Sequence, residues 1–433
     1  MTDPATTSMS AMLLTSAYPI RQHRLSNGLR IVVSPDHTAP IAAVNLGYDV
    51  GSRHERPGLT GFAHLFEHLM FQGSANVGPG EHLQLLQQAG ADLNATTGFD
   101  RTTYFETLPK GGLELALWLE ADRMAGLAVT EEGFGTQRSV IKEEKRQRYD
   151  NVPYGNTTER LLALLFEPTH PYAHPVIGSM TDLDAASLSE VQEFHARYYV
   201  PANAVLTIVG SVDPEHAFAL AEAHFGPLPH TAPPSPLWTP AEPALTGVPR
   251  DEAVSGGPAD AVHFGYRLPQ RGSEEFDAAD LVSTILGQGR GSRLHRRLVR
   301  GDEIAESAGA STLGLIGGTS LGFVHARCRD QVSPAHIEDI MIAEIEDLIA
   351  EGPTDAEVER AKAAFARRWL QELSRMDSRA DQITGFALGE SDPALVNSRI
   401  QVIEAIENGQ IAAAAAHFHP DRRAVLTYRQ EQP

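Results

Sequence analysis

The sequence predicts an α+β fold in which one unit, a sheet covered by helices, occurs twice along the chain. Proline recurs across residues 226–249 too often for a helix or a central strand, and this extended stretch divides the 433-residue chain nearly in half. Residues 198–212 read as a helix end, a proline break and a β-rich run. Residues 417–430 repeat that order, and both stretches contain AVLT. The two halves are therefore expected to be copies of one architecture.

Each half mixes segments of both periodicities. Alternating or β-branched residues predict strands, whereas apolar residues that recur every three or four positions predict helices. The clearest predicted strands are residues 29–35, 41–50, 261–269 and 320–328. The clearest predicted helices are residues 214–225 and 336–350.

The composition is that of a folded, acidic protein. With 42% apolar and 21% charged residues the chain can bury a large core, and its formal charge of −21 repels phosphate backbones, so no nucleic-acid partner is expected. No run of about 18 apolar residues is present, which predicts no membrane span. Asp3 is unlike the basic start of a signal peptide, so a cytoplasmic enzyme is expected, with the periplasm as the alternative. The single cysteine, Cys328, is expected to be a small buried hydrophobe.

The stretch HLFEHLMF, which begins at residue 64, places two histidines and a glutamate inside an apolar run. Thr60 is a possible N-cap and Gly73 a possible C-terminal glycine, so the run is predicted to be a helix. At 3.6 residues per turn, His64 and His68 lie on one face and Glu67 lies beside them. Both imidazoles can therefore reach one ion.

A metal would explain these polar side chains in apolar surroundings. An unpaired buried polar side chain costs about 1–3 kcal/mol or more, and coordination removes that cost. Zinc prefers imidazole and carboxylate ligands, and a catalytic zinc site has three protein ligands and an open position for water. Glu67, adjacent but unbound, could take the proton from that water. HxxEH is the inverted form of a zinc-hydrolase motif, and such a site requires a third ligand.

Residues 130–155 contain the best candidates for the third ligand. Thr130 is a predicted N-cap, and acids in the first turn with bases in the last suit the helix dipole. Spacing alone does not choose between Glu143 and Glu144, and both could instead belong to a solvated charged face.

Residues 91–109 predict a β-hairpin with its turn at residues 98–101. An edge strand there would offer free N–H and C=O groups to an extended peptide. The alternative is a hairpin that simply faces solvent.

Two other stretches are set aside. His170 and His174 have helical spacing, but Pro171 and Pro175 make a continuous helix improbable, so an ordered loop is expected. Residues 287–303 are glycine-rich and basic but lack the spacing of a phosphate-binding loop.

His64, Glu67 and His68, together with SVIKEEKRQRYDN, HPYAHPVIG and VGSVDPE, resemble the pitrilysin family of inverted-motif zinc peptidases, which includes the insulinase and mitochondrial processing peptidase types. The likeness covers essentially the whole chain and suggests a short bacterial two-domain member. It implies two homologous α/β-sandwich domains, each a mixed, mostly antiparallel sheet packed by helices. The expected boundaries are a flexible tail at 1–16, a zinc-bearing domain at 17–228, a proline-rich linker at 229–252 and a domain without a metal motif at 253–433.

The resemblance also implies the residues of the site. The family's third ligand lies 76 positions beyond the second histidine, which is Glu144 here. One Zn²⁺ per chain would then be held by His64, His68 and Glu144, with Glu67 as the general base. The family often has a further glutamate seven residues before the third ligand, where this chain has Gln137.

Asn94, Ala95 and Thr96 match the family's edge strand, along which a peptide substrate would bind. In the family the second half supplies an arginine and, seven residues later, a tyrosine that grip the substrate. Val299 and Glu306 occupy those positions here.

Arg300 lies one position away and could compensate, but the missing pair implies that a related, inactive-type subunit supplies the grip. The chain would then be the zinc-bearing subunit of a heterodimer, or otherwise a homodimer, around a chamber for short or unfolded peptides. Two alternatives stay open. One is a non-catalytic assembly subunit of the same fold, which the intact HxxEH motif disfavours. The other is a lyase of the S-ribosylhomocysteine type, which needs a cysteine near the site, whereas Cys328 lies in the other half.

Overall fold

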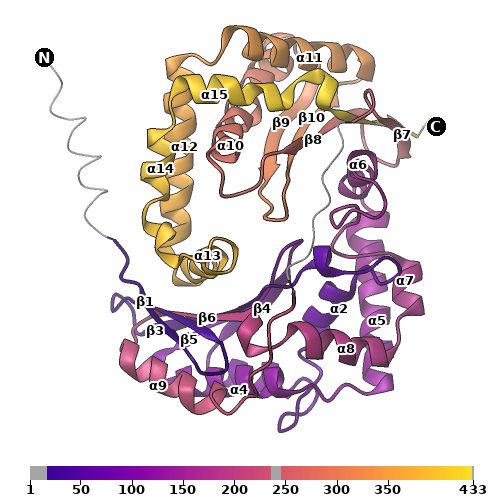
Figure 1. The fold of residues 1–433 in the computed structure, drawn as a ribbon. Helices are drawn as coiled ribbons and strands as arrows, with labels where there is room; N and C mark the ends of the chain where they lie inside the picture. The colour runs from indigo at the N-terminus through magenta and orange to yellow at the C-terminus, as the bar shows by residue number, and fades with distance from the viewer. Residues whose placement is uncertain (1–16, 236–244, 432–433) are drawn as a thin grey trace, which may run out of the picture.

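The computed structural model describes residues 17–235 and 245–431. The predicted tail, residues 1–16, and residues 236–244 of the predicted linker lie outside the described residues. The two halves of the chain form two separate sheets with their own helices, one above the other in Figure 1. Within the described ranges, no helix has the length and apolar character needed to cross a membrane.

The first half contains a mixed sheet of six strands in the order β1-β2-β6-β3-β5-β4. Neighbouring strands are antiparallel except β2 and β6, which run parallel. The strands are β1 (Arg21–Arg24), β2 (Arg30–Pro35), β3 (Ile41–Tyr48), β4 (Asp92–Thr97), β5 (Thr102–Pro109) and β6 (Ala204–Gly210). The predicted hairpin is therefore formed by β4 and β5, and β4 lies at the edge of the sheet.

The second half repeats this arrangement with five strands in the order β7-β11-β8-β10-β9. Only β7 and β11 are parallel, as β2 and β6 are in the first half. The strands are β7 (Arg250–Ser255), β8 (Ala261–Leu268), β9 (Ala305–Leu313), β10 (Ser320–Cys328) and β11 (Ala424–Gln430). The two AVLT strings begin β6 and β11, which hold equivalent places, so the prediction of a repeated α/β unit is confirmed.

Helices pack on both sheets (Figure 1). Those of the first half are α2 (Phe62–Leu69), α3 (Glu81–Gln88), α4 (Leu113–Ala125), α5 (Glu131–Lys145), α6 (Thr157–Leu165), α7 (Met180–Ala185), α8 (Leu188–Tyr198) and α9 (Pro214–Phe225). Those of the second half are α10 (Glu274–Gly287), α11 (Pro334–Glu351), α12 (Asp355–Ser374), α13 (Met376–Gly389), α14 (Arg399–Ala405) and α15 (Asn408–Ala414). The two helices predicted most clearly fall within α9 and α11. Both start at a side-chain cap followed by proline, since Asp213 accepts the His216 N–H and Ser333 accepts the His336 N–H.

One helix of each half packs against the sheet of the other half. Helix α13 of the second half lies on β3 and β6 of the first sheet, and α6 of the first half lies on β8 and β11 of the second. Gly47 in β3 and Gly265 in β8 allow these close approaches, because a Cβ on Gly47 would overlap Thr384 of α13 and a Cβ on Gly265 would lie 3.1 Å from Leu165 of α6. Neither sheet is therefore covered on both faces by its own half.

Candidate metal centre

Helix α2 carries the HxxEH motif, and its ends differ from the prediction. Its N-cap is Gly61, with φ of +92°, and the helix ends at Leu69, short of Gly73. Thr60 is not the cap, because its hydroxyl donates to Asp182 at 2.5 Å. The first-turn amides of Gly61 and Ala63 instead donate to the buried carboxylate of Glu55, at 2.8 and 2.7 Å.

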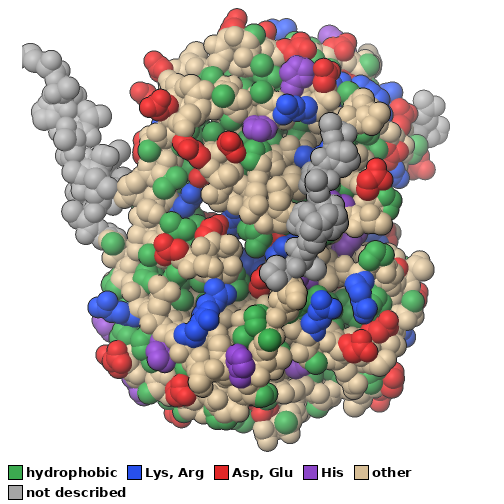
Figure 2. All heavy atoms as spheres, in the orientation of Figure 1, with side chains coloured by type: hydrophobic (Ala, Val, Ile, Leu, Met, Phe, Trp, Pro, Cys, Tyr) green, Lys and Arg blue, Asp and Glu red, His purple; other side chains and the backbone are tan. Residues whose placement is uncertain are grey.

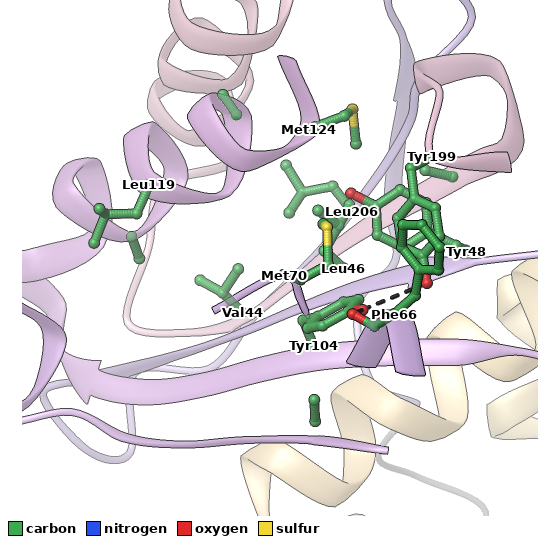
Figure 3. Close-up of a cluster of buried hydrophobic side chains, with 14 of the residues drawn as sticks. Val44, Leu46, Tyr48, Phe66, Met70, Tyr104, Leu119, Met124, Tyr199 and Leu206 are labelled. Atoms are coloured by element: carbon green, nitrogen blue, oxygen red, sulfur yellow. Dashed lines mark hydrogen bonds between the residues drawn. The ribbon is translucent and has the colours of Figure 1, made fainter. Parts of the chain in front are cut away.

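The apolar face of α2 fixes the helix against the first sheet. Phe62, Leu65, Phe66 and Leu69 are at most 1% exposed. Figure 3 shows Phe66 among the tyrosine rings at positions 48, 104 and 199, and the hydroxyl of Tyr104 donates to the Phe66 carbonyl at 3.2 Å. This packing leaves the two histidines on the face that turns toward α5.

Helix α5 begins where the sequence predicts, since the Thr130 hydroxyl accepts the Gly133 N–H at 3.1 Å. Of the two candidate carboxylates, α5 brings only Glu144 to the imidazoles. The Glu144 side chain is 17% exposed, whereas that of Glu143 is 54% exposed and binds Arg146. Adjacent residues on a helix point about 100° apart, so only one of the two can face α2.

The side chains of His64, His68 and Glu144 converge. The Oε2 atom of Glu144 lies 3.8 Å from Nε2 of His64 and 3.5 Å from Nε2 of His68. All three ligand atoms lie within 4.8 Å of one another, and no other group of three such residues was found in residues 17–235 and 245–431. A tetrahedral zinc with bonds of 2.0–2.1 Å separates its ligand atoms by about 3.3 Å, and the distances from Glu144 to the two imidazoles are close to that spacing.

The charge of His64 and the hydrogen bond of His68 also fit a metal. Burial lowers the pKa of His64 to about 3, with smaller contributions from His68 and Arg148, so its ring is neutral and able to coordinate. His68 Nδ1 lies 3.3 Å from Oε1 of Gln137, which accepts a hydrogen bond from Nδ1–H, so the proton stays on Nδ1 and Nε2 keeps a free lone pair. Gln137 thus orients a candidate ligand although it lacks the charge of a carboxylate.

Glu67 lies beside these ligands without joining them. Its Oε2 accepts a hydrogen bond from the Thr97 hydroxyl at 2.6 Å, and burial raises its pKa, which this bond partly opposes. The sequence did not identify Thr97 as a site residue, because the predicted substrate edge ended at Thr96. The strand alternation could have indicated it, because Thr97 shares the face of the buried Ala95.

The predicted substrate edge lies in β4, next to this centre. Asn94 and Thr96 are exposed and Ala95 is buried, as expected for an edge strand with one covered face. The Ala95 N–H donates to the side chain of its neighbour Asn94 at 2.9 Å, so this amide points away from β5. An extended peptide could displace that local contact and pair with β4.

The residues set aside from the sequence lie elsewhere. His174 approaches Glu55, with Nδ1 3.6 Å from Oε2, and His170 stacks on Phe166, so neither joins the three converging ligands. In the predicted grip positions, Val299 packs on the second hydrophobic core and Glu306 pairs with Arg327 at 2.6 Å.

Arg300 is exposed. Cys328 is 1% exposed, as predicted for a buried hydrophobe, and burial raises its pKa to about 11.

Two repeated α/β halves with a His–His–Glu group in the first half fit the class of zinc hydrolases with the inverted motif. Residues 30–174 match the family profile described as Insulinase (Peptidase family M16), and residues 185–365 match the profile described as Peptidase M16 inactive domain. The chain belongs to peptidase family M16.

Relatives support this assignment over nearly the full length. The zinc protease PqqE of Helicobacter pylori is 29% identical over 91% of this chain and 89% of its own length. A Mycobacterium leprae protein described as a zinc protease is 30% identical over 82% of this chain and 81% of its own length. The crystal structure of a protease from Helicobacter pylori superposes with a TM-score of 0.89 at 27% identity, covering 96% of this chain and 100% of that chain.

Proposed function

We propose that this protein is a zinc-dependent endopeptidase that hydrolyses short or unfolded peptides. The observation that carries the proposal is the convergence of His64, His68 and Glu144, whose ligand atoms lie within 4.8 Å of one another. These residues would hold one Zn²⁺ per chain. The zinc protease names of the two relatives support the same metal.

Zinc, when bound there, supplies Lewis acidity toward a carbonyl oxygen and makes water more acidic. Glu67 is the base that takes the proton from the attacking water and delivers it to the leaving amine. The Thr97 hydroxyl holds the Glu67 carboxylate at 2.6 Å. Gln137 keeps the His68 ring turned toward the metal.

The substrate binds as an added strand on β4, along Asn94, Ala95 and Thr96. The outward amide of Ala95 provides a main-chain donor for this pairing. The formal charge of −21 favours basic peptides modestly, since Figure 2 shows acidic and basic side chains interspersed on the face it draws.

A second subunit completes the site in this proposal. Val299 and Glu306 leave the second half without the arginine and tyrosine that resemblance led us to expect. The structure of the periplasmic protease PqqL from Escherichia coli, alike in fold with a TM-score of 0.78, has about twice the length, and this chain covers 48% of it. We therefore propose a heterodimer with a related inactive-type chain, or otherwise a homodimer, as the equivalent two-unit assembly.

The proposed enzyme is tested by metal content and by one substitution. The purified chain should contain one zinc, and Glu67→Gln should retain that zinc while losing peptide hydrolysis. A protein that contains zinc but cleaves nothing, alone or with its related partner, would favour the non-catalytic assembly subunit. Hydrolysis that survives in Glu67→Gln would remove the proposed base.

The partner is tested separately. The chain should gain peptidase activity when a related chain encoded nearby is co-expressed, and the two should elute together at the mass of a dimer. Full activity of the isolated chain as a monomer would exclude the subunit proposal and leave the metal centre intact.

A further inference from the structure

The turn between β4 and β5 is held by both halves of the chain. Within the first half, the backbone amides of Ser52 and Arg53 donate to the carbonyls of Gly98 and Phe99 at 3.1 and 3.0 Å. The next contacts come from the other half of the molecule. Three successive side chains, those of residues 99–101, reach into it.

Phe99 and Asp100 meet the loop that joins β9 to β10. Phe99 is 9% exposed and shares an apolar cluster with Leu315. Asp100 accepts the Ile316 N–H at 3.0 Å through Oδ2 and the Tyr172 hydroxyl at 2.6 Å through Oδ1. The Ile316 contact ties the turn to the end of the second sheet, whereas Tyr172, like Arg53, whose Nε lies 3.0 Å from Asp100 Oδ1, belongs to the first half.

Arg101 contacts α13, the helix of the second half that packs on β3 and β6 of the first sheet. Its Nη2 donates to Asp381 Oδ2 at 2.7 Å, and its Nη1 donates to the Asp381 carbonyl at 3.1 Å. Arg101, Thr97 and Arg271 line a cavity of about 370 Å³ between the halves. The Arg101–Asp381 pair is thus an ionic contact between the turn and α13 at the edge of this cavity.

The turn directly continues the strand that faces the metal centre. β4 ends at Thr97, which hydrogen-bonds Glu67, and carries Ala95, whose amide is the outward donor. Strand register and direction are set where the hairpin turn is fixed. A shift of the turn would therefore displace the edge to which a substrate strand must pair.

We propose that Asp100 and Arg101 are positioning residues through which the second half, which carries no metal motif, sets the place of the substrate edge. The inference rests on the proposed peptidase function and deepens it by giving the second half a role in substrate binding. The metal ligands belong to α2 and α5, outside this hairpin. The contacts of Asp100 and Arg101 therefore act on the substrate edge and do not affect metal binding.

The test is a double-mutant cycle on Arg101→Gln and Asp381→Asn. Each variant should raise KM for a peptide substrate about fivefold or more and keep one zinc per chain, and any loss of kcat should be smaller than the rise in KM, because the hairpin reaches the base only through the Thr97–Glu67 bond. The double variant should be no worse than Arg101→Gln alone, because that change already removes both hydrogen bonds to Asp381. The matched control is the Arg160–Asp251 pair, which also joins the two halves and is similarly exposed, at 35% and 34%. Arg160→Gln with Asp251→Asn should leave KM unchanged.

Three kinetic results would overturn the proposal: an unchanged KM, losses that multiply in the double variant, or an equal rise in KM in the control. A lower melting temperature with unchanged KM would indicate a merely structural contact and would also overturn it. If the wild-type protein cleaves no peptide, the proposed function fails by itself. Amide hydrogen exchange then tests the positioning role of Arg101, because residues 92–101 should exchange faster in Arg101→Gln than in the wild type and in the control. Equal exchange rates in the three proteins would exclude that role.

Discussion

Glu144→Gln is expected to weaken zinc binding by at least about 100-fold, whereas Glu143→Gln should leave it unchanged. The two carboxylates are neighbours on α5, so the pair of variants tests position and not composition. Glu144 Oε2 lies 3.5 Å from His68 Nε2, while the Glu143 carboxylate binds Arg146 and Gln147 at the surface.

The magnitude follows from the kind of contact that is lost. Removing a residue that only supports a metal ligand costs 10–100-fold in affinity, so removing a charged ligand itself should cost at least about 100-fold, or about 2.7 kcal/mol. The metal-free fold should hardly change. The other partner of Glu144 is Arg148, which is 71% exposed, so this ion pair contributes less than about 0.5 kcal/mol.

The assay is competition for zinc with a chromophoric chelator at fixed free metal, together with the metal content after dialysis and the melting temperature with and without zinc. Wild type and Glu143→Gln should show the same affinity and the same stabilisation by zinc, and Glu144→Gln should show neither. Full-affinity zinc binding by Glu144→Gln would refute the ligand assignment. Equal losses in both variants would mean that the charge of α5 matters and not the direction of one side chain.

Three further outcomes are expected. Gln137→Glu should tighten zinc binding several-fold in the same competition assay, because a carboxylate 3.3 Å from His68 Nδ1 makes that imidazole a more basic ligand. Gly47→Ala should lower the free energy of unfolding by about 2 kcal/mol in urea titrations, because its Cβ would overlap a buried side chain of α13; no loss would contradict the close packing of this helix. Burial alone would raise the pKa of Glu357, but hydrogen bonds led by those from Arg293 lower it from 4.5 to about 2. Its stabilisation is therefore complete above pH 4.5 and lost toward pH 2, so Glu357→Gln should cost about 2 kcal/mol at pH 7 and progressively less as the pH falls through that window, and a constant cost would exclude the ionic contribution.

The sequence alone determined the features that depend on local periodicity. His64 and His68 share a face because a helix repeats every 3.6 residues, and the alternation of residues 91–109 predicted the hairpin that β4 and β5 form. The repeated AVLT string correctly indicated two copies of one unit. Turn and strand signals act over a few residues, so they can be read without knowing the partners.

The tertiary structure decided what depends on distant partners. Spacing left Glu143 and Glu144 open, and the rotation of α5 against α2 turns only Glu144 toward the imidazoles. Thr60 is a suitable N-cap by residue type, yet its hydroxyl donates a hydrogen bond to Asp182, which is 122 residues away. No local sequence pattern indicates that α6 and α13 each pack on the sheet of the other half. The same is true of the contacts between the second half and the β4–β5 turn. Such contacts follow from which surfaces pack together, and packing is a property of the whole chain and not of any short segment.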